Sequence, residues 1–125
     1  MSAEPTFTAL MDYARVFYAR WDQINLNDKL EHDYPRMLSS IKKDTRLIFI
    51  VNPNNPTGTL VDPKIVRSFC LEASKKAIVF SDEAYLEFLD PKDQSSMIDL
   101  VRAGENVIVC RTFSKIYGLA GLRMG

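Results

Sequence analysis

Three short apolar runs lie in the middle and later parts of the chain and predict buried strands. They cover 46–51, 77–80 and 107–110 and consist mostly of valine, isoleucine, leucine and phenylalanine. A continuous apolar run of this length is typical of a strand with both faces buried, as in a parallel sheet. A weaker alternation of polar and apolar residues over 20–26 predicts one more strand nearer the N-terminus.

Between these runs, apolar residues recur at helical spacing. The pattern predicts helices over about 8–17, 33–42, 62–76 and 95–103. The apolar face of the first helix is expected to hold Leu10, Tyr13, Ala14 and Phe17. Asp62 followed by Pro63 is a typical helix start, and Gly104 is a typical helix end. Strands that alternate with helices favour an α/β fold, with a mainly parallel sheet, flanking helices and right-handed crossovers.

The overall composition is that of an ordinary globular domain, with 46% hydrophobic and 26% charged residues. A length of 125 residues is enough for one domain with its own core. The 16 basic and 16 acidic side chains cancel and form no basic stripe, so we expect no nucleic-acid partner. No apolar run approaches the ~18–20 residues of a membrane span, so we expect no membrane partner.

The cysteines and the single histidine predict no metal site, because their spacing matches no ligand pattern. Cys70 and Cys110 lie in apolar surroundings and are predicted to be small buried residues with reduced thiols. With no secretory signal at the N-terminus, this favours the cytoplasm. His32 lies in the polar loop 27–33, and we expect no catalytic role for it, because a lysine described below can supply proton transfer and no serine or cysteine partner is evident.

A polar cluster follows each of the three clear strands. The clusters are 52–58, 82–85 and 112–115. In parallel α/β sheets, ligands bind beyond the carboxyl ends of the strands. Because three separate strand ends deliver polar groups to one edge, the sequence predicts a binding site there.

Lys115 and Asp82 are the most informative residues of these clusters. A lone lysine at this place is more often a solvated charge at a helix start. Lys115, however, follows a strand among small and hydroxyl residues, which favours a partly desolvated amine that could attack a carbonyl. Asp82 could be a turn or capping aspartate, or the acceptor for a protonated ring nitrogen.

The other candidates also have a structural and a functional interpretation. Tyr85 is either a half-buried core aromatic or a hydroxyl donor to an oxygen anion, and Asn55 is either part of a plain turn or a group on the same edge. Thr112, Ser114 and Arg123 surround the lysine and would suit a phosphate dianion. They are equally compatible with a capped helix N-terminus, which binds phosphate as well.

These motifs together resemble a known family. The matching runs are Asn55-Pro-Thr-Gly58, Asp82-Glu-Ala-Tyr85, Thr112-Phe-Ser-Lys115 and Gly118-Leu-Ala-Gly-Leu-Arg123. They resemble the fold-type I, class I/II aminotransferases that depend on pyridoxal 5'-phosphate (PLP), and the fuller motifs are most similar to the histidinol-phosphate aminotransferase group. The resemblance extends from residue 4 to the end of the chain. It is highly specific for the cofactor and much less specific for the substrate.

The resemblance implies a role for each candidate. Lys115 would bind the PLP aldehyde covalently and move the proton at the substrate Cα, and Asp82 would pair with the ring nitrogen while staying ionised. Tyr85 and Asn55 would hydrogen-bond the ring 3'-oxygen. The 5'-phosphate would be held by Thr112, Ser114 and Arg123. Phe7 matches the position of an aromatic ring that stacks on the cofactor, although a core position for Phe7 stays open.

The resemblance also implies a reaction and its partners. The amino group would move between an amino donor, best matched by histidinol phosphate or glutamate, and a 2-oxo acid such as 2-oxoglutarate, in histidine biosynthesis. The full-length protein would be a cytoplasmic homodimer. Two alternatives stay open. One is another class I/II aminotransferase or an enzyme similar to threonine-phosphate decarboxylase, and the other is the aminotransferase-like effector domain of a transcription regulator.

Relative to the family, residues 1–125 correspond to the central part of the PLP-binding large domain. The N-terminal segment and the C-terminal small domain would be absent. The small domain carries the arginine that clamps the substrate carboxylate in this family, and no residue here matches it. We therefore expect that the 125-residue chain alone does not catalyse transamination.

Overall fold

A five-stranded, all-parallel sheet forms the centre of the computed structural model, which describes residues 1–124. In sheet order the strands are β2 (Gln23–Asn25), β1 (Ser2–Glu4), β3 (Leu47–Val51), β4 (Ile78–Asp82) and β5 (Val107–Cys110). The three strands predicted from apolar runs therefore lie next to one another. The fold class expected from the sequence, an α/β domain with a mainly parallel sheet, is confirmed.

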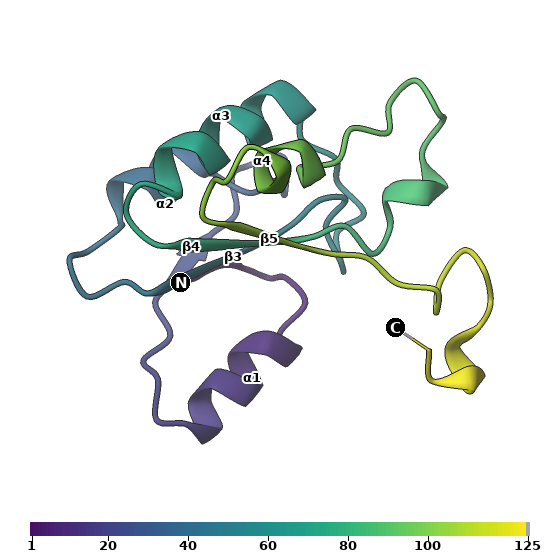
Figure 1. The fold of residues 1–125 in the computed structure, drawn as a ribbon. Coiled ribbons are helices and arrows are strands. Elements are labelled where there is room, and N and C mark those ends of the chain that lie inside the picture. The colour runs from purple at the N-terminus through teal and green to yellow at the C-terminus, as the bar shows by residue number, and fades with distance from the viewer. Residues whose placement is uncertain (125) are drawn as a thin grey trace.

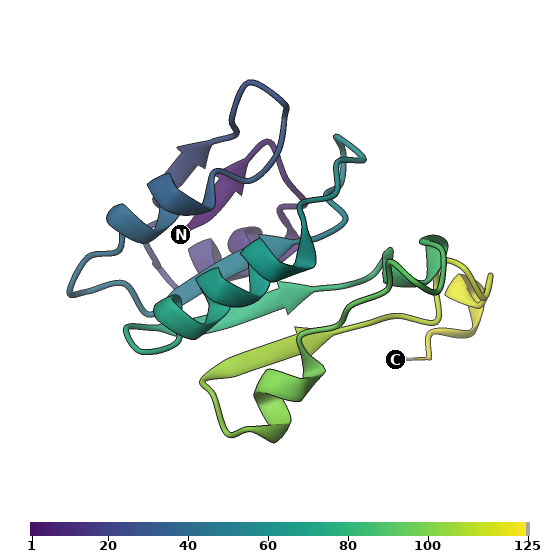
Figure 2. The same cartoon turned by 90° about the horizontal axis from the view of Figure 1, so that it is seen from above.

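Helices cover both faces of the sheet, but unequally (Figures 1 and 2). The face drawn uppermost in Figure 1 carries α2 (Tyr34–Ser39), α3 (Pro63–Ala73) and α4 (Ile98–Arg102). The opposite face carries α1 (Ala9–Val16). Two short 3₁₀ helices, η1 (Leu86–Phe88) and η2 (Ala120–Leu122), lie in the loops after β4 and β5. All four predicted helices are thus present, with bounds that are shorter than expected.

The alternation of side chains along β3 divides the core into two layers. Ile48 and Ile50 pack into the large cluster under α2, α3 and α4. Phe49 and Val51 point the other way and pack with Met11 of α1. Since each face of β3 meets an apolar layer, the strand has to be apolar at every position, as the continuous run predicted.

Local capping explains where two of the helices begin. The Asp62 carboxylate accepts a hydrogen bond from the backbone N–H of Lys64, and Pro63 occupies the first turn. Asp33 accepts one from the N–H of Arg36 in the same way at the start of α2. Among residues 1–124, no helix has the length and apolar character needed to cross a membrane.

Strand β1 was not predicted, because Ser2, Ala3 and Glu4 show no strand-like pattern. Its position comes from its neighbours: it pairs with β2 over three residues and with β3 at Phe49. Ser2 is fully buried and accepts a hydrogen bond from the Trp21 indole N–H at 2.8 Å. A short polar strand is therefore stable here because it lies between two others.

Two predictions about burial were wrong, the first of them in part. On the predicted apolar face of α1, Leu10 packs with the buried Met11, but Tyr13 and Phe17 are 70% and 81% exposed. Cys110 is exposed, although Cys70 is buried as predicted. The reason for Cys110 is that β5 is the last strand of the sheet, so within residues 1–124 no strand pairs with its other side.

Candidate functional site

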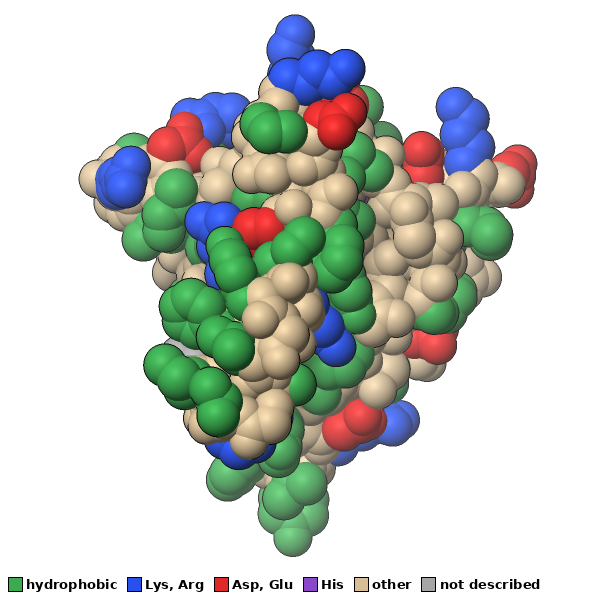
Figure 3. Space-filling view, turned by 90° about the vertical axis from the view of Figure 1, so that its right-hand side faces the viewer, with side chains coloured by type: hydrophobic (Ala, Val, Ile, Leu, Met, Phe, Trp, Pro, Cys, Tyr) green, Lys and Arg blue, Asp and Glu red, His purple; other side chains and the backbone are tan. Residues whose placement is uncertain are grey.

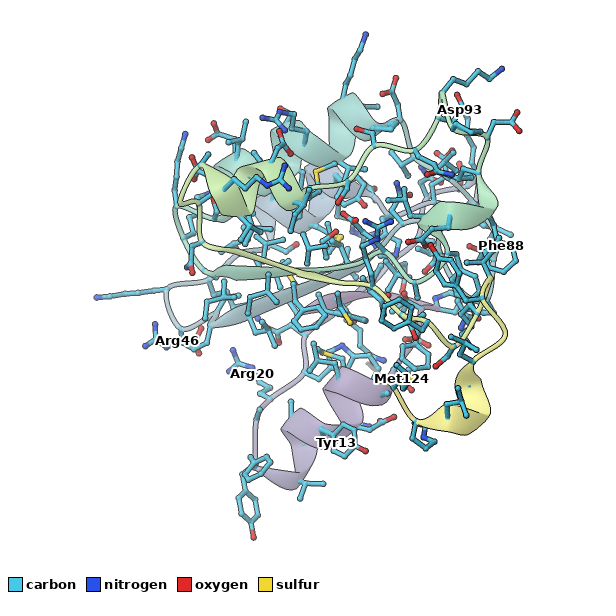
Figure 4. All side chains as sticks on the ribbon, turned by 45° about the vertical axis from the view of Figure 1, so that its right-hand side comes forward. Tyr13, Arg20, Arg46, Phe88, Asp93 and Met124 are labelled. Atoms are coloured by element: carbon cyan, nitrogen blue, oxygen red, sulfur yellow. The ribbon has the colours of Figure 1, made fainter. Side chains whose placement is uncertain are left out.

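The three polar clusters begin at the same edge of the sheet, the one formed by the carboxyl ends of its strands. Val51, Asp82 and Cys110, the last residues of β3, β4 and β5, lie in register across the three strands. Figure 3 looks onto this edge, where hydrophobic side chains lie beside a few charged ones. Figure 4 places Phe88 and Met124 on this side of the sheet, and Arg20 and Arg46 on the opposite side. The predicted convergence of three strand ends on one edge is confirmed.

Asp82, Tyr85 and Lys115 form the centre of this edge. The Lys115 ammonium lies over the Tyr85 ring, with Nζ 5.6 Å from the ring centroid. Its positive charge also acts on the Asp82 carboxylate, which lies close enough to be stabilised by it. An amine, a phenol and a carboxylate therefore share one region, formed by the end of β4 and the loops after β4 and β5, as the sequence predicted.

Asp82 is only 9% exposed, and burial raises the pKa of its carboxylate above the ordinary value. Two contacts partly offset this effect, namely the N–H of Ala84, which donates to Oδ1 at 2.9 Å, and the charge of Lys115. Within residues 1–124, no hydrogen bond is made to the second oxygen, Oδ2. A buried carboxylate of this kind gains stability from a cationic or N–H partner.

Asn55 lies on the same edge, in the loop after β3. It lines a cleft together with Tyr85, Phe88 and Leu89, so the loop after β3 faces the loop after β4. Asn55 and Tyr85 thus contribute to one cavity although 30 residues separate them in the chain. A ligand in this cleft could receive hydrogen bonds from both side chains.

The loop after β5 contains the candidate phosphate ligands, and over residues 111–124 it forms no α-helix. The Thr112 hydroxyl accepts a hydrogen bond from the N–H of Ser114 at 3.0 Å, which makes a tight turn. The loop then folds back, with the N–H of Gly118 bonded to the carbonyl of Lys115 and Gly118 at a φ of 65°. Glycine is suited to this position because it adopts positive φ without strain.

Only two of the three predicted phosphate ligands lie together in the structure. Thr112 and Ser114 are adjacent and half-buried. Arg123 donates instead to the carbonyl of Ala120 at 2.9 Å and has the left-handed backbone conformation, with φ 51°. Phe7 is 45% exposed in the loop between β1 and α1, and within residues 1–124 no ring contact joins it to the other candidates.

Lys115 is exposed, whereas the sequence argument required partial desolvation. The difference arises because Lys115 follows an edge strand, in a loop whose residues are mostly exposed between 111 and 124. The placement over the Tyr85 ring, within electrostatic reach of Asp82, supports the role expected for this lysine. Its environment among residues 1–124 is nevertheless more open than expected.

Sequence reasoning missed Glu83, which is 2% exposed beside Asp82. Its carboxylate accepts hydrogen bonds from the N–H of Met97 at 2.7 Å and from the Ser96 hydroxyl at 2.5 Å. These bonds fix the start of the segment before α4 to the end of β4. The sequence held one signal for such a residue, because a carboxylate directly after a buried strand residue needs hydrogen-bond partners. Those partners could not be identified from the sequence, because they lie 13 and 14 residues away.

His32 is buried, although it belongs to a loop of polar residues. Burial lowers the pKa of His32 to about 4, and the hydrogen bond to Asn54 opposes this only in part. Tyr34, whose ring centroid lies 5.7 Å away, is the titratable group packed against it and remains neutral, because burial raises its pKa. His32 is therefore uncharged at neutral pH. The prediction that it has no catalytic role remains a prediction.

We expect this burial to make stability depend on pH. The folded state binds fewer protons than the unfolded state between pH 6.5 and about 4, so stability is complete above 6.5 and falls as the pH drops. Between pH 7 and pH 5 the loss should be about 2 kcal/mol. The measurement is the unfolding free energy of the full-length protein minus that of His32→Gln, which keeps an N–H donor but does not titrate. A difference that is constant over this range would contradict the expectation.

Comparison with known proteins gives a consistent match. Residues 1–125 match the model of a family described as aminotransferase class I and II. The chain is 40% identical over 123 residues to histidinol-phosphate aminotransferase from Halalkalibacterium halodurans, covering 98% of this chain and 33% of that protein. It is 48% identical over 103 residues to the aromatic amino acid aminotransferase of Mycobacterium sp. strain KMS, covering 82% of this chain and 28% of that protein.

A solved structure matches as well. It is histidinol-phosphate aminotransferase from Sinorhizobium meliloti in complex with pyridoxal-5'-phosphate, with a TM-score of 0.86 at 28% identity, covering 98% of this chain and 33% of that one. The chain thus spans about a third of the length of the relatives that it matches.

Proposed function

This chain belongs to the class I and II aminotransferases, and from that premise we propose that the full-length protein is a PLP-dependent aminotransferase. Residues 1–125 would form the central part of its large, PLP-binding domain. The observation that carries the proposal is the grouping of the Lys115 ammonium with the Tyr85 ring and the buried Asp82 carboxylate at the carboxyl ends of adjacent parallel strands.

The residues present fit PLP. The Asp82 oxygen Oδ2 makes no hydrogen bond to the described residues and can accept one from a protonated ring nitrogen. Asn55 and Tyr85 line one cleft and can both donate to a ring oxygen. Thr112 and Ser114 offer hydroxyl and N–H groups for a phosphate. Arg123 is in the same loop and would have to exchange its bond to Ala120 for the phosphate.

Each residue then has a defined task. When bound, PLP supplies an aldehyde for covalent attachment and a protonated ring that accepts the electrons of the substrate Cα–H bond. Lys115 holds the cofactor and moves the proton at the substrate Cα. Asp82 keeps the ring nitrogen protonated through its negative charge. Tyr85 and Asn55 hold the ring in the cleft, and Phe7 would stack on it.

The cofactor assignment can be tested by reduction with borohydride. In the yellow, full-length protein, reduction should fix the mass of the cofactor on Lys115, as read by peptide mass spectrometry. Labelling at another lysine would contradict the assignment of Lys115. A folded, full-length protein that takes up no PLP would contradict the proposed function itself.

For the substrate, we propose histidinol phosphate as amino donor and 2-oxoglutarate as acceptor, in histidine biosynthesis. The relatives that support this cover 98% of the chain. The 48% identity to an aromatic amino acid aminotransferase favours a second candidate, with phenylalanine or tyrosine as donor. Steady-state kcat/KM for histidinol phosphate and for phenylalanine, measured on the same preparation, separates the two. Release of carbon dioxide in place of a keto acid would indicate a decarboxylase.

The proposal includes a cytoplasmic homodimer. Support for association comes from large apolar side chains on α1 and just after it, such as Tyr13, Phe17 and Tyr18, which are 70%, 81% and 98% exposed. In the full-length protein, part of this surface would be covered by the rest of the chain and part by a second copy. The molar mass in solution, from light scattering of the full-length protein, tests the dimer.

We expect the 125-residue chain alone to show no measurable transamination at saturating PLP. Transamination requires the Cα–H bond to be held perpendicular to the ring, and that positioning supplies much of the rate. No residue of this chain is assigned to hold the substrate carboxylate. The assay is glutamate formation from histidinol phosphate and 2-oxoglutarate, with the full-length protein as positive control. Steady turnover by the 125-residue chain would show that the remaining two thirds are dispensable.

A further inference from the structure

The Asn54 side chain is buried, at 4% exposure, in the loop that carries Asn55. Its amide nitrogen donates to the carbonyl of Pro5 at 3.2 Å and to the Thr57 hydroxyl at 2.8 Å. Its amide oxygen accepts from the Thr6 hydroxyl at 2.7 Å and pairs with His32 Nε2 at 3.2 Å. An amide has two donor and two acceptor positions, so the hydrogen-bonding capacity of Asn54 is completely used.

The partners fix the orientation of this amide. The carbonyl of Pro5 can only accept, so the atom facing it must be the amide nitrogen. The oxygen then faces His32, which means that His32 carries its proton on Nε2 and donates it. His32 is neutral because of its burial, and its other ring nitrogen is left without a partner within residues 1–124. His32 and Thr6 thus act as donors to Asn54.

These bonds join three segments that are distant in the sequence. Thr6 is 48 residues from Asn54 and directly precedes Phe7, while His32 is 22 residues away. The backbone of Asn54 also closes its own loop, with its N–H bonded to the carbonyl of Thr59 and its carbonyl bonded to the N–H of Gly58. The segment before Phe7 and the loop of Asn55 are therefore held together through one side chain.

We propose that Asn54 is a positioning residue. It fixes the loop 52–59, and through it Asn55, relative to the segment 5–7, and so sets where two of the candidate cofactor contacts lie. The side-chain amide of Asn54 acts through these two segments, because all its hydrogen-bonding positions are occupied within the protein. The inference rests on the proposed function for its cofactor part, while the coupling of the two segments can be measured without cofactor.

The test uses the full-length protein and compares variants of this network. Asn54→Ala removes all four hydrogen bonds. Thr6→Val removes only one and keeps the shape of the side chain, whereas Thr6→Ser keeps the hydroxyl. Asn52→Ala is the matched control, since Asn52 belongs to the same loop but exchanges its two hydrogen bonds with the backbone of Val61.

The first readout is amide hydrogen exchange of the protein without PLP. We expect Asn54→Ala and Thr6→Val to speed exchange in both 5–8 and 52–59, and Thr6→Ser to behave as the wild type. Asn52→Ala should affect only the loop 52–61. If exchange in Asn54→Ala rises in 52–59 alone, or in neither segment, the coupling does not exist and the proposal is overturned.

The second readout concerns the cofactor. A hydrogen bond to a charged oxygen contributes enough that its misalignment in Asn54→Ala should raise the PLP dissociation constant by about tenfold. The pH midpoint of the absorption change of bound PLP should also move upward, as it should in Asn55→Ala, and Thr6→Val should give a smaller shift in the same direction. A wild-type dissociation constant and midpoint in Asn54→Ala would overturn the proposal, even with both segments loosened.

The two readouts distinguish a failure of the proposed function from a failure of the proposal about Asn54. If the wild-type, full-length protein binds no PLP, the proposed function fails, and hydrogen exchange still decides whether Asn54 couples the segments. Should Asn54→Ala not fold, the pair Thr6→Val and Thr6→Ser decides the matter, because a purely steric effect would not be rescued by serine.

Discussion

Lys115→Ala in the full-length protein is expected to lower kcat by about 10⁴-fold or more, because it removes both the proton-transfer group and the covalent attachment of the cofactor. Lys115 is the lysine whose ammonium lies over the Tyr85 ring and whose charge acts on the Asp82 carboxylate. The measurement is formation of the ketone product in a single turnover and of glutamate in the steady state, at PLP concentrations that saturate the variant.

Two additional observations make this result specific. Lys76→Ala removes an exposed lysine just after α3 and should leave kcat unchanged. Added methylamine should restore part of the activity of Lys115→Ala, because a small amine can occupy the space of the lost side chain and move the proton. If Lys115→Ala keeps more than a tenth of the wild-type kcat, another group moves the proton and the assignment is wrong.

Asp82→Asn is expected to produce the second largest effect, a fall in kcat of about 10²–10³-fold, the range for loss of one electrostatic partner of a developing charge. Asparagine keeps the size of the side chain but not the charge that holds the ring nitrogen protonated. Asp62→Asn is the matched control, since asparagine caps α3 as well as aspartate does. A wild-type kcat in Asp82→Asn would show that Asp82 serves only as a turn residue.

The same variant should have an opposite effect on stability without PLP. Burial raises the pKa of Asp82, so the folded protein binds more protons than the unfolded one in the window above the ordinary value of 3.8. Stability is therefore lost as the pH rises through that window, and the asparagine variant does not suffer this loss. At pH 7, apo Asp82→Asn should melt at a higher temperature than the apo wild type, and the difference should vanish below pH 3.8. Bound PLP should reverse the order.

The sequence correctly predicted those strands whose own residues form an apolar run. The run that forms β3 is apolar because both faces of this strand are buried, whereas β4 and β5 are buried only in part, with Ile78 and Ile108 exposed. Their polar ends could be placed on one edge because parallel strands share a direction. Strand β1 was missed because Ser2, Ala3 and Glu4 are held by pairing with two neighbours and not by a pattern of their own.

The errors in burial have a similar origin. Helical spacing shows which residues of α1 share a face, but it does not show which face meets the sheet. The face that contains Met11 lies against Phe49 and Val51, while Tyr13 and Phe17 point away. The exposure of Cys110 and Lys115 depends on β5 being the edge strand, which is a property of the sheet order and not of the local sequence.

The network around Asn54 could not be predicted, because its bonds span 22 and 48 residues and involve common polar side chains. The interpretation of 27–33 as a polar loop gave no reason to expect that His32 is buried. In contrast, the candidates Asp82, Tyr85 and Lys115 lie within short motifs, and the resemblance to the aminotransferases identified them directly.

The candidate site lies at the carboxyl ends of the parallel strands. The turns at the other end of the sheet can therefore be altered without changing the site. The turns before β3, β4 and β5 lie there, near Arg46 in Figure 4, and no candidate site residue belongs to them. Lengthening a flexible loop costs only about 0.6 kcal/mol for each doubling of its length. An epitope tag or a fluorescent reporter would therefore be best inserted directly after Lys43 or Gly104, both of which are exposed, where it can be carried without disturbing catalysis.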